Sequence, residues 1–179
     1  MKKMTFLFVV NYYVVILLSI LTIGCGQTQV SPTATKGDSS FKAFLPKWEE
    51  CISGFINGNS SLWKKNNSQS DSATFFGAFG GNEKGWKEIS ARLDWASSQF
   101  KESGAKVKVE YISIIVIGDL AYTVSIERGE ERFGNMEKAA PRALRSTQIF
   151  RKENGEWKLF HRHADPLFEK KVTDTNPQK

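Results

Sequence analysis

The chain has 179 residues, of which 40% are hydrophobic and 25% charged, a balance typical of a globular protein with room for one domain and a leader segment. The formal net charge is +6 at pH 7, but acidic and basic residues are mixed along the chain. Because no block of like charge resembles a basic arm, we expect no nucleic-acid partner.

Residues 1–24 have the layout of a secretory signal peptide, with two lysines before an apolar run. A membrane-spanning helix is the alternative, because the run approaches the roughly 20 residues that cross a bilayer. The ending Leu21-Thr22-Ile23-Gly24-Cys25 resembles the bacterial lipobox, in which the chain is cut before a cysteine that receives acyl chains such as palmitate. We therefore expect a lipoprotein of the bacterial cell envelope, anchored in the membrane through Cys25 and facing away from the cytoplasm.

Residues 25–40 contain few large apolar residues and many Thr, Ser, Gln and Gly, which predicts a flexible tether between the lipid and the domain. Lipidation of Cys25 would leave Cys51 as the only other cysteine, so we expect no disulfide within the chain. Cys51 falls on the apolar side of a predicted helix, where a buried and inert thiol is expected.

Two main helices are predicted in the first half of the domain. Apolar residues at helical spacing indicate a helix over Leu45–Asn57, with Pro46 in its first turn, and a second helix over Lys84–Lys101. A short helical piece is expected around Ser61–Lys65. The glycine-containing segment Ala73–Gly81 favours a strand or an extended segment.

After the second helix the apolar period changes to two, which indicates strands. Gly118-Asp119 and Asn154-Gly155 are predicted hairpin turns, and a longer polar loop covers Arg132–Pro141. Helices followed by an antiparallel meander predict an α+β domain in which helices pack on an antiparallel sheet. The predicted strands are Lys106–Ile117, Leu120–Glu130, Leu144–Lys152 and Trp157–Ala164.

The segment GDLAYTVSIER and the closing hairpin RxTxIFRxxxGxWKLxHRHADP resemble the nuclear transport factor 2-like superfamily, and within it the SnoaL-like domain group. The resemblance implies the ketosteroid isomerase-like fold, a cone-shaped α+β barrel in which helices close over a strongly curved antiparallel sheet and leave a pocket. It also implies a homodimer formed through the other face of the sheet. We expect this domain over residues 41–167, followed by a disordered tail over 168–179.

The resemblance does not select one function, because the superfamily contains isomerases, epoxide hydrolases, polyketide cyclases and a kinase association domain. The epoxide hydrolases use an arginine and an acid that Arg128 and Glu130 match loosely. They also use an acid from their last strand, and near the corresponding position this chain has the base Arg162. The catalytic residues are therefore unknown at this stage, and whether the chain is an enzyme stays open.

The period of two and the superfamily together suggest which side chains line the pocket. We expect Phe160 and Arg162 to face the cavity and the side with Trp157 and His161 to face the partner subunit, although a single bulge would invert this assignment. The candidate ligand-binding residues are Trp48, Tyr122, Arg128, Glu130, Gln148 and Arg162.

Three arginines, Arg128, Arg145 and Arg162, could bind a carboxylate if two of them converge. Ordinary salt bridges with residues such as Glu127 or Glu130 are the alternative.

The motif His161-x-His163-x-Asp165 could form part of a zinc or non-haem iron site. The chain has only these 2 His and no cysteine pair, so we expect histidines of a core or an interface, with no metal and no cofactor.

Three functions remain open. The first is a membrane-tethered dimer that binds a small apolar or anionic ligand in the cavity without catalysis. The second is an isomerase, hydrolase or cyclase that uses Arg128, Glu130 or Asp165 with a histidine. The third is an assembly module whose dimer surface is the function. A carboxylate with a shifted pKa inside the cavity would favour the enzyme, and a filled cavity would favour the assembly module.

Overall fold

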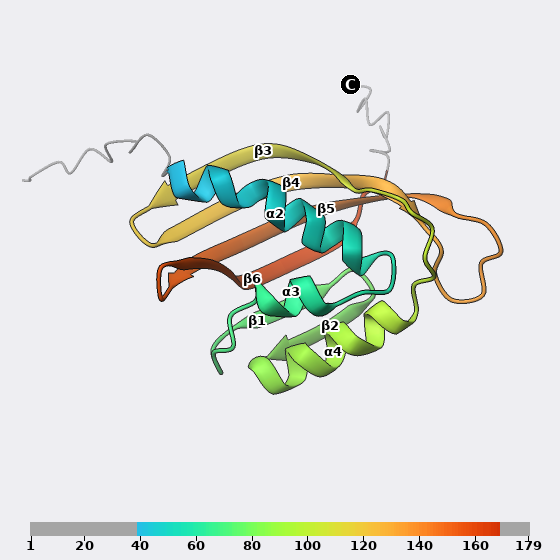
Figure 1. The fold of residues 1–179 in the computed structure, drawn as a ribbon, viewed down its shortest axis with the longest axis horizontal. Coiled ribbons are helices and arrows are strands. Elements are labelled where there is room, and N and C mark those ends of the chain that lie inside the picture. Colours follow the sequence, from blue (N-terminus) through green and yellow to red (C-terminus); the bar gives the residue numbers. More distant parts are fainter. Residues whose placement is uncertain (1–38, 169–179) are drawn as a thin grey trace, which may run out of the picture. The chain divides into compact units, whose positions relative to one another are not determined.

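The computed structural model describes residues 39–168 (Figure 1). The expected signal peptide, the lipidation site Cys25, most of the tether and most of the tail lie outside the described residues. The elements in chain order are α2 (Ser39–Phe55), α3 (Ser61–Lys65), β1 (Thr74–Gly77), β2 (Gly80–Lys84), α4 (Trp86–Ser98), β3 (Lys108–Ile117), β4 (Leu120–Glu131), β5 (Ala140–Glu153) and β6 (Glu156–Pro166).

The strands form one six-stranded sheet in the order β2-β1-β6-β5-β4-β3, and the helices cover one of its faces (Figure 1). The predicted meander of β3 to β6 is confirmed, since each of these strands pairs antiparallel with the next one along the chain. The predicted α+β fold, with helices packed on a sheet, is confirmed. The sheet is mixed rather than antiparallel throughout, because β1 runs parallel to β6, with Thr74 opposite His161. Within residues 39–168 the sheet is also open rather than closed into a barrel, since β2 and β3 each pair with a single neighbour.

Helix α2 begins at Ser39, six residues before the predicted start, and Pro46 lies inside it. Proline inside a helix costs roughly 3 kcal/mol because a hydrogen bond is lost and the ring is crowded. The turns before Pro46 are held by packing instead. Phe41 is fully buried, and its ring centre lies 5.2 Å from that of Phe150 and 5.0 Å from that of Trp157. Tertiary contacts therefore extend the helix beyond the point that propensity alone predicts.

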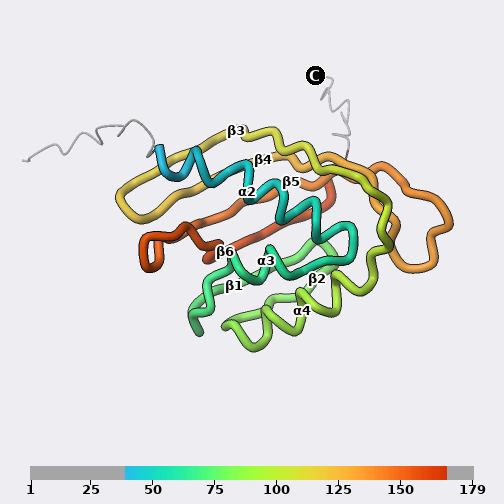
Figure 2. Tube along the Cα trace, in the orientation of Figure 1, coloured from blue at the N-terminus to red at the C-terminus, as the bar shows by residue number. Residues whose placement is uncertain are grey.

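The β1–β2 hairpin occupies the segment that the sequence marks as extended, and α4 follows it back along β2 (Figure 2). The prediction of Lys84–Lys101 for this helix is too long at both ends, because Lys84 pairs with Thr74 in the sheet. At the end of α2, the Asn57 carboxamide donates to the Ala105 carbonyl at 2.9 Å and accepts from the Gly104 amide at 2.9 Å. This side chain fixes the helix against the segment that leads into β3.

The closing hairpin turns at Asn154-Gly155 as predicted, with φ of 51° and 82°. Both values suit the tight turn that matches the twist of the strands. The register of β6 shifts beside this turn, since Ile149 pairs with His161 but Phe150 pairs with Leu159. Phe160 is the extra residue in this bulge. Because of it, the alternation of β6 side chains between the two faces of the sheet shifts by one residue at that point.

The bulge corrects the predicted faces of β6. Trp157 faces the helices, because its indole N–H donates to the Ser40 hydroxyl at 2.9 Å. Arg162 also lies on the helix-covered side and is 3% exposed, as expected. Phe160 does not line the cavity, and its ring lies 4.2 Å from the guanidinium carbon of Arg151. Within residues 39–168, no helix is long and apolar enough to cross a membrane.

Candidate functional site

A chain of buried polar side chains connects α2 to three strands beneath it. The Trp48 indole N–H donates to Gln148 Oε1 at 3.0 Å, and Gln148 Nε2 donates to Glu127 Oε1 at 3.1 Å. These two partners fix the orientation of the Gln148 carboxamide. Ser146 donates to the same Glu127 oxygen at 3.0 Å. All four side chains are almost fully buried, so this network lies in the interior.

Glu127 and Arg162 form a buried ion pair at the centre of this network. Arg162 Nη1 and Nη2 donate to Glu127 Oε1 and Oε2 at 2.7 and 2.8 Å. Burial raises the pKa of the Glu127 carboxyl, but the charges of Arg162 and Arg142 and the bonds from Arg162 and Ser146 outweigh it, so the pKa lies below its ordinary value. Glu127 is therefore ionised and tightly held, and it cannot donate a proton near neutral pH.

A second ion pair lies at the ends of β4 and β5. Arg142 Nε is 2.9 Å from Glu131 Oε2, yet this oxygen has no aligned hydrogen-bond partner among residues 39–168. Burial lowers the pKa of Arg142, and burial raises the pKa of Glu131. The attraction between the two charges therefore does not fully offset their lost hydration.

A cavity lies beside these pairs, between the helices and the sheet. Its interior has a volume of about 30 Å³, room for about one or two water molecules. A larger hollow of about 280 Å³, which we call the vestibule, adjoins it and shares Ala78, Phe79, Arg142 and Leu144 with it. The interior is lined by Ile52, Phe55, Trp63, Phe75, Gly77, Ala78, Phe79, Arg92, Ala96, Glu127, Arg142, Leu144 and Arg162.

The tip of the β1–β2 hairpin lies between the interior and the vestibule. Arg92 on α4 donates to the carbonyls of Phe79 and Gly80 at 3.3 and 2.7 Å and so ties the tip to the helix. The Phe79 ring stacks on that of Phe133, with their centres 4.3 Å apart. Gly80 has a φ of +79°, a backbone conformation that side-chain-bearing residues rarely adopt. The tip therefore closes the cavity with a few specific contacts.

The structure brings together three of the candidate ligand-binding residues. Trp48, Gln148 and Arg162 belong to one network, although only Arg162 lines the cavity directly. The other three, Tyr122, Arg128 and Glu130, are exposed. They alternate along β4 with buried residues, of which Glu127 belongs to the network under the helices, so they lie on the opposite face of the sheet.

The two histidines lie on that opposite face as well. His161 Nδ1 is 2.7 Å from the Thr74 hydroxyl, and burial followed by the nearby His163 lowers the pKa of His161. Asp165 is shared between His163 at 3.5 Å and Arg145 at 3.8 Å. Among residues 39–168 no group of three or more His, Cys, Asp or Glu side chains is placed to hold a metal.

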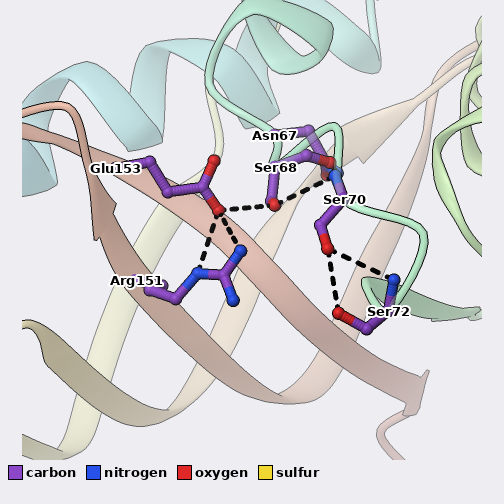
Figure 3. Close-up of polar contacts among 6 residues, drawn as sticks. All are labelled: Asn67, Ser68, Ser70, Ser72, Arg151 and Glu153. Carbon is purple, nitrogen blue, oxygen red and sulfur yellow. Dashed lines mark hydrogen bonds and ion pairs between the residues drawn. The ribbon is translucent and has the colours of Figure 1, made fainter.

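A further polar cluster joins the loop after α3 to the end of β5 (Figure 3). The Ser68 hydroxyl donates to Glu153 Oε1 at 2.6 Å, and Arg151 Nη2 donates to the same oxygen at 2.6 Å. Ser68 is completely buried, so its hydroxyl is out of reach of a substrate. The Ser70 and Ser72 hydroxyls lie 2.9 Å apart further along the loop. This cluster fixes the loop and is not a candidate active site.

The family model of the SnoaL-like domain matches residues 49–168, which is most of the chain. The chain belongs to this SnoaL-like family. No protein of curated function matches the sequence.

Solved structures show the same fold for this SnoaL-like domain. A nuclear transport factor 2-like superfamily protein from Salmonella enterica serovar Typhimurium superposes with a TM-score of 0.61 at 16% identity, covering 75% of this chain and 93% of that one. A ketosteroid isomerase-like protein from Erwinia carotovora atroseptica gives a TM-score of 0.60 at 13% identity, covering 73% of this chain and 98% of that one. At such identities the likeness establishes the fold.

Sequence reasoning missed several residues of the SnoaL-like domain's cavity. Glu127 was considered only as a salt-bridge partner, and Arg142, rather than Arg128 or Arg145, is the second arginine near Arg162. One signal was present in the sequence. Gln148 is a candidate beside Arg162 in the sequence analysis, and its strand β5 pairs with β4 so that Thr123 lies opposite Gln148 and Ser125 opposite Ser146. Following that register would have placed Glu127 inside.

Proposed function

We propose that the SnoaL-like domain binds a small, largely apolar molecule between its helices and its sheet, and that it does so without catalysis. The observation that carries this proposal is the lining of the cavity and vestibule, which consists mainly of aromatic and aliphatic side chains with a few charged groups among them. Apolar walls with a small number of placed polar groups are typical of ligand pockets.

The size of the free space indicates how such a ligand would be held. The interior of about 30 Å³ is too small for a metabolite, whereas the vestibule of about 280 Å³ approaches the lower end of ligand pockets, roughly 300 Å³. A ligand would fill the vestibule and displace Phe79 to reach further inwards. Phe79 is 41% exposed, and its ring packs on those of Phe133 and Phe100, so the apolar body of a ligand would have to cover these rings in its place.

The enzyme alternative has one carboxyl with a raised pKa at the vestibule, that of Glu131, but Arg142 Nε lies 2.9 Å from its Oε2 and already pairs with it. A general acid or base needs a pKa near the working pH and a free position towards the substrate. Glu127 has a lowered pKa, and its carboxylate accepts hydrogen bonds from Arg162, Ser146 and Gln148. The proposed partners for catalysis, Arg128, Glu130 and Asp165 with a histidine, lie away from the cavity.

Ligand binding is tested by fluorescence titration with N-phenyl-1-naphthylamine, an uncharged aromatic probe. We expect saturable binding to the purified protein, and we expect Ala78→Trp to abolish it, because Ala78 lines both the interior and the vestibule. Leu120→Trp is the matched control, since Leu120 is 49% exposed at the start of β4 and lines neither space. Binding that survives Ala78→Trp unchanged would place the probe elsewhere and reject the proposal.

The proposal includes a homodimer formed through the uncovered face of the sheet. Several large apolar side chains of β3 and β4 are exposed there, among them Ile115 at 48%, Ile117 at 70% and Tyr122 at 38%. A contiguous apolar patch on a strand pair is typical of a protein–protein interface. The same observation supports an assembly role as the second candidate function.

The proposal also includes a lipid anchor at Cys25, supported by the lipobox-like sequence before it. Several acyl chains give stable attachment, whereas one chain gives only marginal binding. Cells expressing the full chain and fed a labelled palmitate should incorporate the label into the membrane fraction. Cys25→Ser should lose the label, and Cys51→Ser should keep it. Equal labelling of wild type and Cys25→Ser would refute the anchor.

A further inference from the structure

Two arginine–glutamate pairs meet at the cavity, and they differ in how well each is bonded. Arg162 holds Glu127 with two hydrogen bonds of 2.7 and 2.8 Å, and neighbouring side chains complete the coordination. Arg142 approaches Glu131 to 2.9 Å through Nε, but the contacted oxygen has no aligned hydrogen-bond partner among residues 39–168. The hydrogen bonds of the first pair are complete, and those of the second pair are not.

The incomplete pair is nevertheless buried. The Arg142 and Glu131 side chains are only 15% and 14% exposed, so both have lost most of their hydration. Burial lowers the pKa of Arg142 and raises that of Glu131, as expected for charges that their partner compensates only in part. Buried polar groups that stay unsatisfied are rare in folded proteins, and they occur preferentially at functional sites.

The position of Arg142 gives this pair a direct relation to a ligand. Arg142 lines both the interior and the vestibule, whereas Glu131 lines the vestibule alone. Apart from these two residues, the described part of the chain lines the vestibule with apolar side chains and alanines. A guanidinium at the boundary of an apolar hollow offers planar, charge-assisted hydrogen bonds to a carboxylate.

We propose that Arg142 anchors the carboxylate, or a similar anionic group, of the bound molecule, and that this group takes the place of Glu131. The apolar body of the ligand then occupies the vestibule. This inference rests on the proposed function and narrows it to small organic acids with an aromatic or aliphatic body. Glu131 acts as an internal substitute for the ligand's acid when the site is empty. Arg162, whose donors are committed to Glu127, has a structural role.

The test uses two probes that share one apolar body. 1-Anilinonaphthalene-8-sulfonate carries a sulfonate, and N-phenyl-1-naphthylamine lacks it. We expect the wild-type protein to bind the sulfonate tighter than the neutral probe. Arg142→Met should weaken sulfonate binding by about 10- to 100-fold, the range of one lost charge-assisted hydrogen bond, and leave the neutral probe unchanged. Arg145→Met is the matched control, because Arg145 is 63% exposed and lines neither space.

A second variant tests the exchange with Glu131 and does not depend on Arg142→Met being folded. Glu131→Gln removes the internal competitor and should tighten sulfonate binding severalfold, again without effect on the neutral probe. Circular dichroism checks the fold of each variant.

The outcomes separate this inference from the proposed function. If the neutral probe binds but Arg142→Met and Glu131→Gln leave the preference for the sulfonate unchanged, Arg142 is not the anchor and only this inference fails. Equal weakening of both probes by Arg142→Met would also overturn it, because the arginine would then support the pocket as a whole. If neither probe binds the wild-type protein, the proposed function fails as well.

Discussion

At the scale of single residues, Glu127 is the acceptor that joins the buried polar network of this domain. Its carboxylate accepts hydrogen bonds from Arg162, Ser146 and Gln148, and through Gln148 it connects to Trp48 on α2. Such a network ties one helix to three strands at a defined register. It also makes the stability of the domain sensitive to mutation of these residues, because removing one partner of a buried ion pair leaves the other charge uncompensated.

We predict that Glu127→Gln lowers the free energy of unfolding by about 3–5 kcal/mol at pH 7, since it leaves the buried Arg162 charge without its partner. The loss should depend on pH. The folded-state pKa of Glu127 lies below its unfolded value, so its stabilisation is fully present above the unfolded pKa and is lost as the pH falls through the folded pKa. The difference between wild type and variant should therefore narrow below about pH 4.5.

Urea unfolding of both proteins between pH 3 and pH 7 measures this difference. Glu130→Gln is the control, because Glu130 is exposed on the opposite face and should change stability by less than about 0.5 kcal/mol. A gap between wild type and Glu127→Gln that stays constant down to the lowest pH would show that the ionised Glu127 is not the source of the stability.

At the scale of the elements, the strands and the closing turn follow from the sequence, but the faces of the strands do not. The period of two and Asn154-Gly155 predict the last hairpin, and β5 and β6 form it. The bulge at Phe160 leaves no mark in the apolar pattern, so the sequence cannot show that Trp157 and Arg162 share a face. Local propensity also misplaces the start of α2, because the burial of Phe41 outweighs the cost of Pro46.

The arrangement of β4 explains why part of the candidate site was placed on the wrong face. Thr123, Ser125 and Glu127 are buried under the helices, whereas Tyr122 and Ile126 point to the uncovered side. A rule that places apolar residues in the interior would therefore choose the set with Tyr122 and Ile126 as the buried face of β4, which is the wrong one. Partners on other strands, such as Gln148 and Arg162, make the polar set the interior one, and the period of two within β4 cannot show this by itself.

At the scale of the whole domain, the two faces of the sheet have different roles. One face packs against the helices and holds the buried ion pair, the cavity and the vestibule. The other face has no cover among residues 39–168 and exposes isoleucines at the outer edge, where β3 has a single neighbour. Exposed apolar strands at a sheet edge favour association, so natural proteins usually protect them. A homodimer through this face would protect them and leave the vestibule open to ligands.

We predict that the combined change Ile115→Lys and Ile117→Lys converts a dimer into a monomer without unfolding it. In a two-fold dimer each change occurs twice, so four isoleucines leave the interface. Burial of an isoleucine side chain contributes about 1.5–3 kcal/mol, and paired lysines add repulsion, so association should weaken by at least about a thousandfold.

Sedimentation velocity over a range of protein concentrations measures the change. Leu62→Lys is the matched control, since Leu62 is 42% exposed on α3, on the helix side of the sheet, and should leave association unchanged. A wild-type protein that stays monomeric at the highest concentrations, or a double variant that still dimerises, would show that this face does not join two copies of the chain.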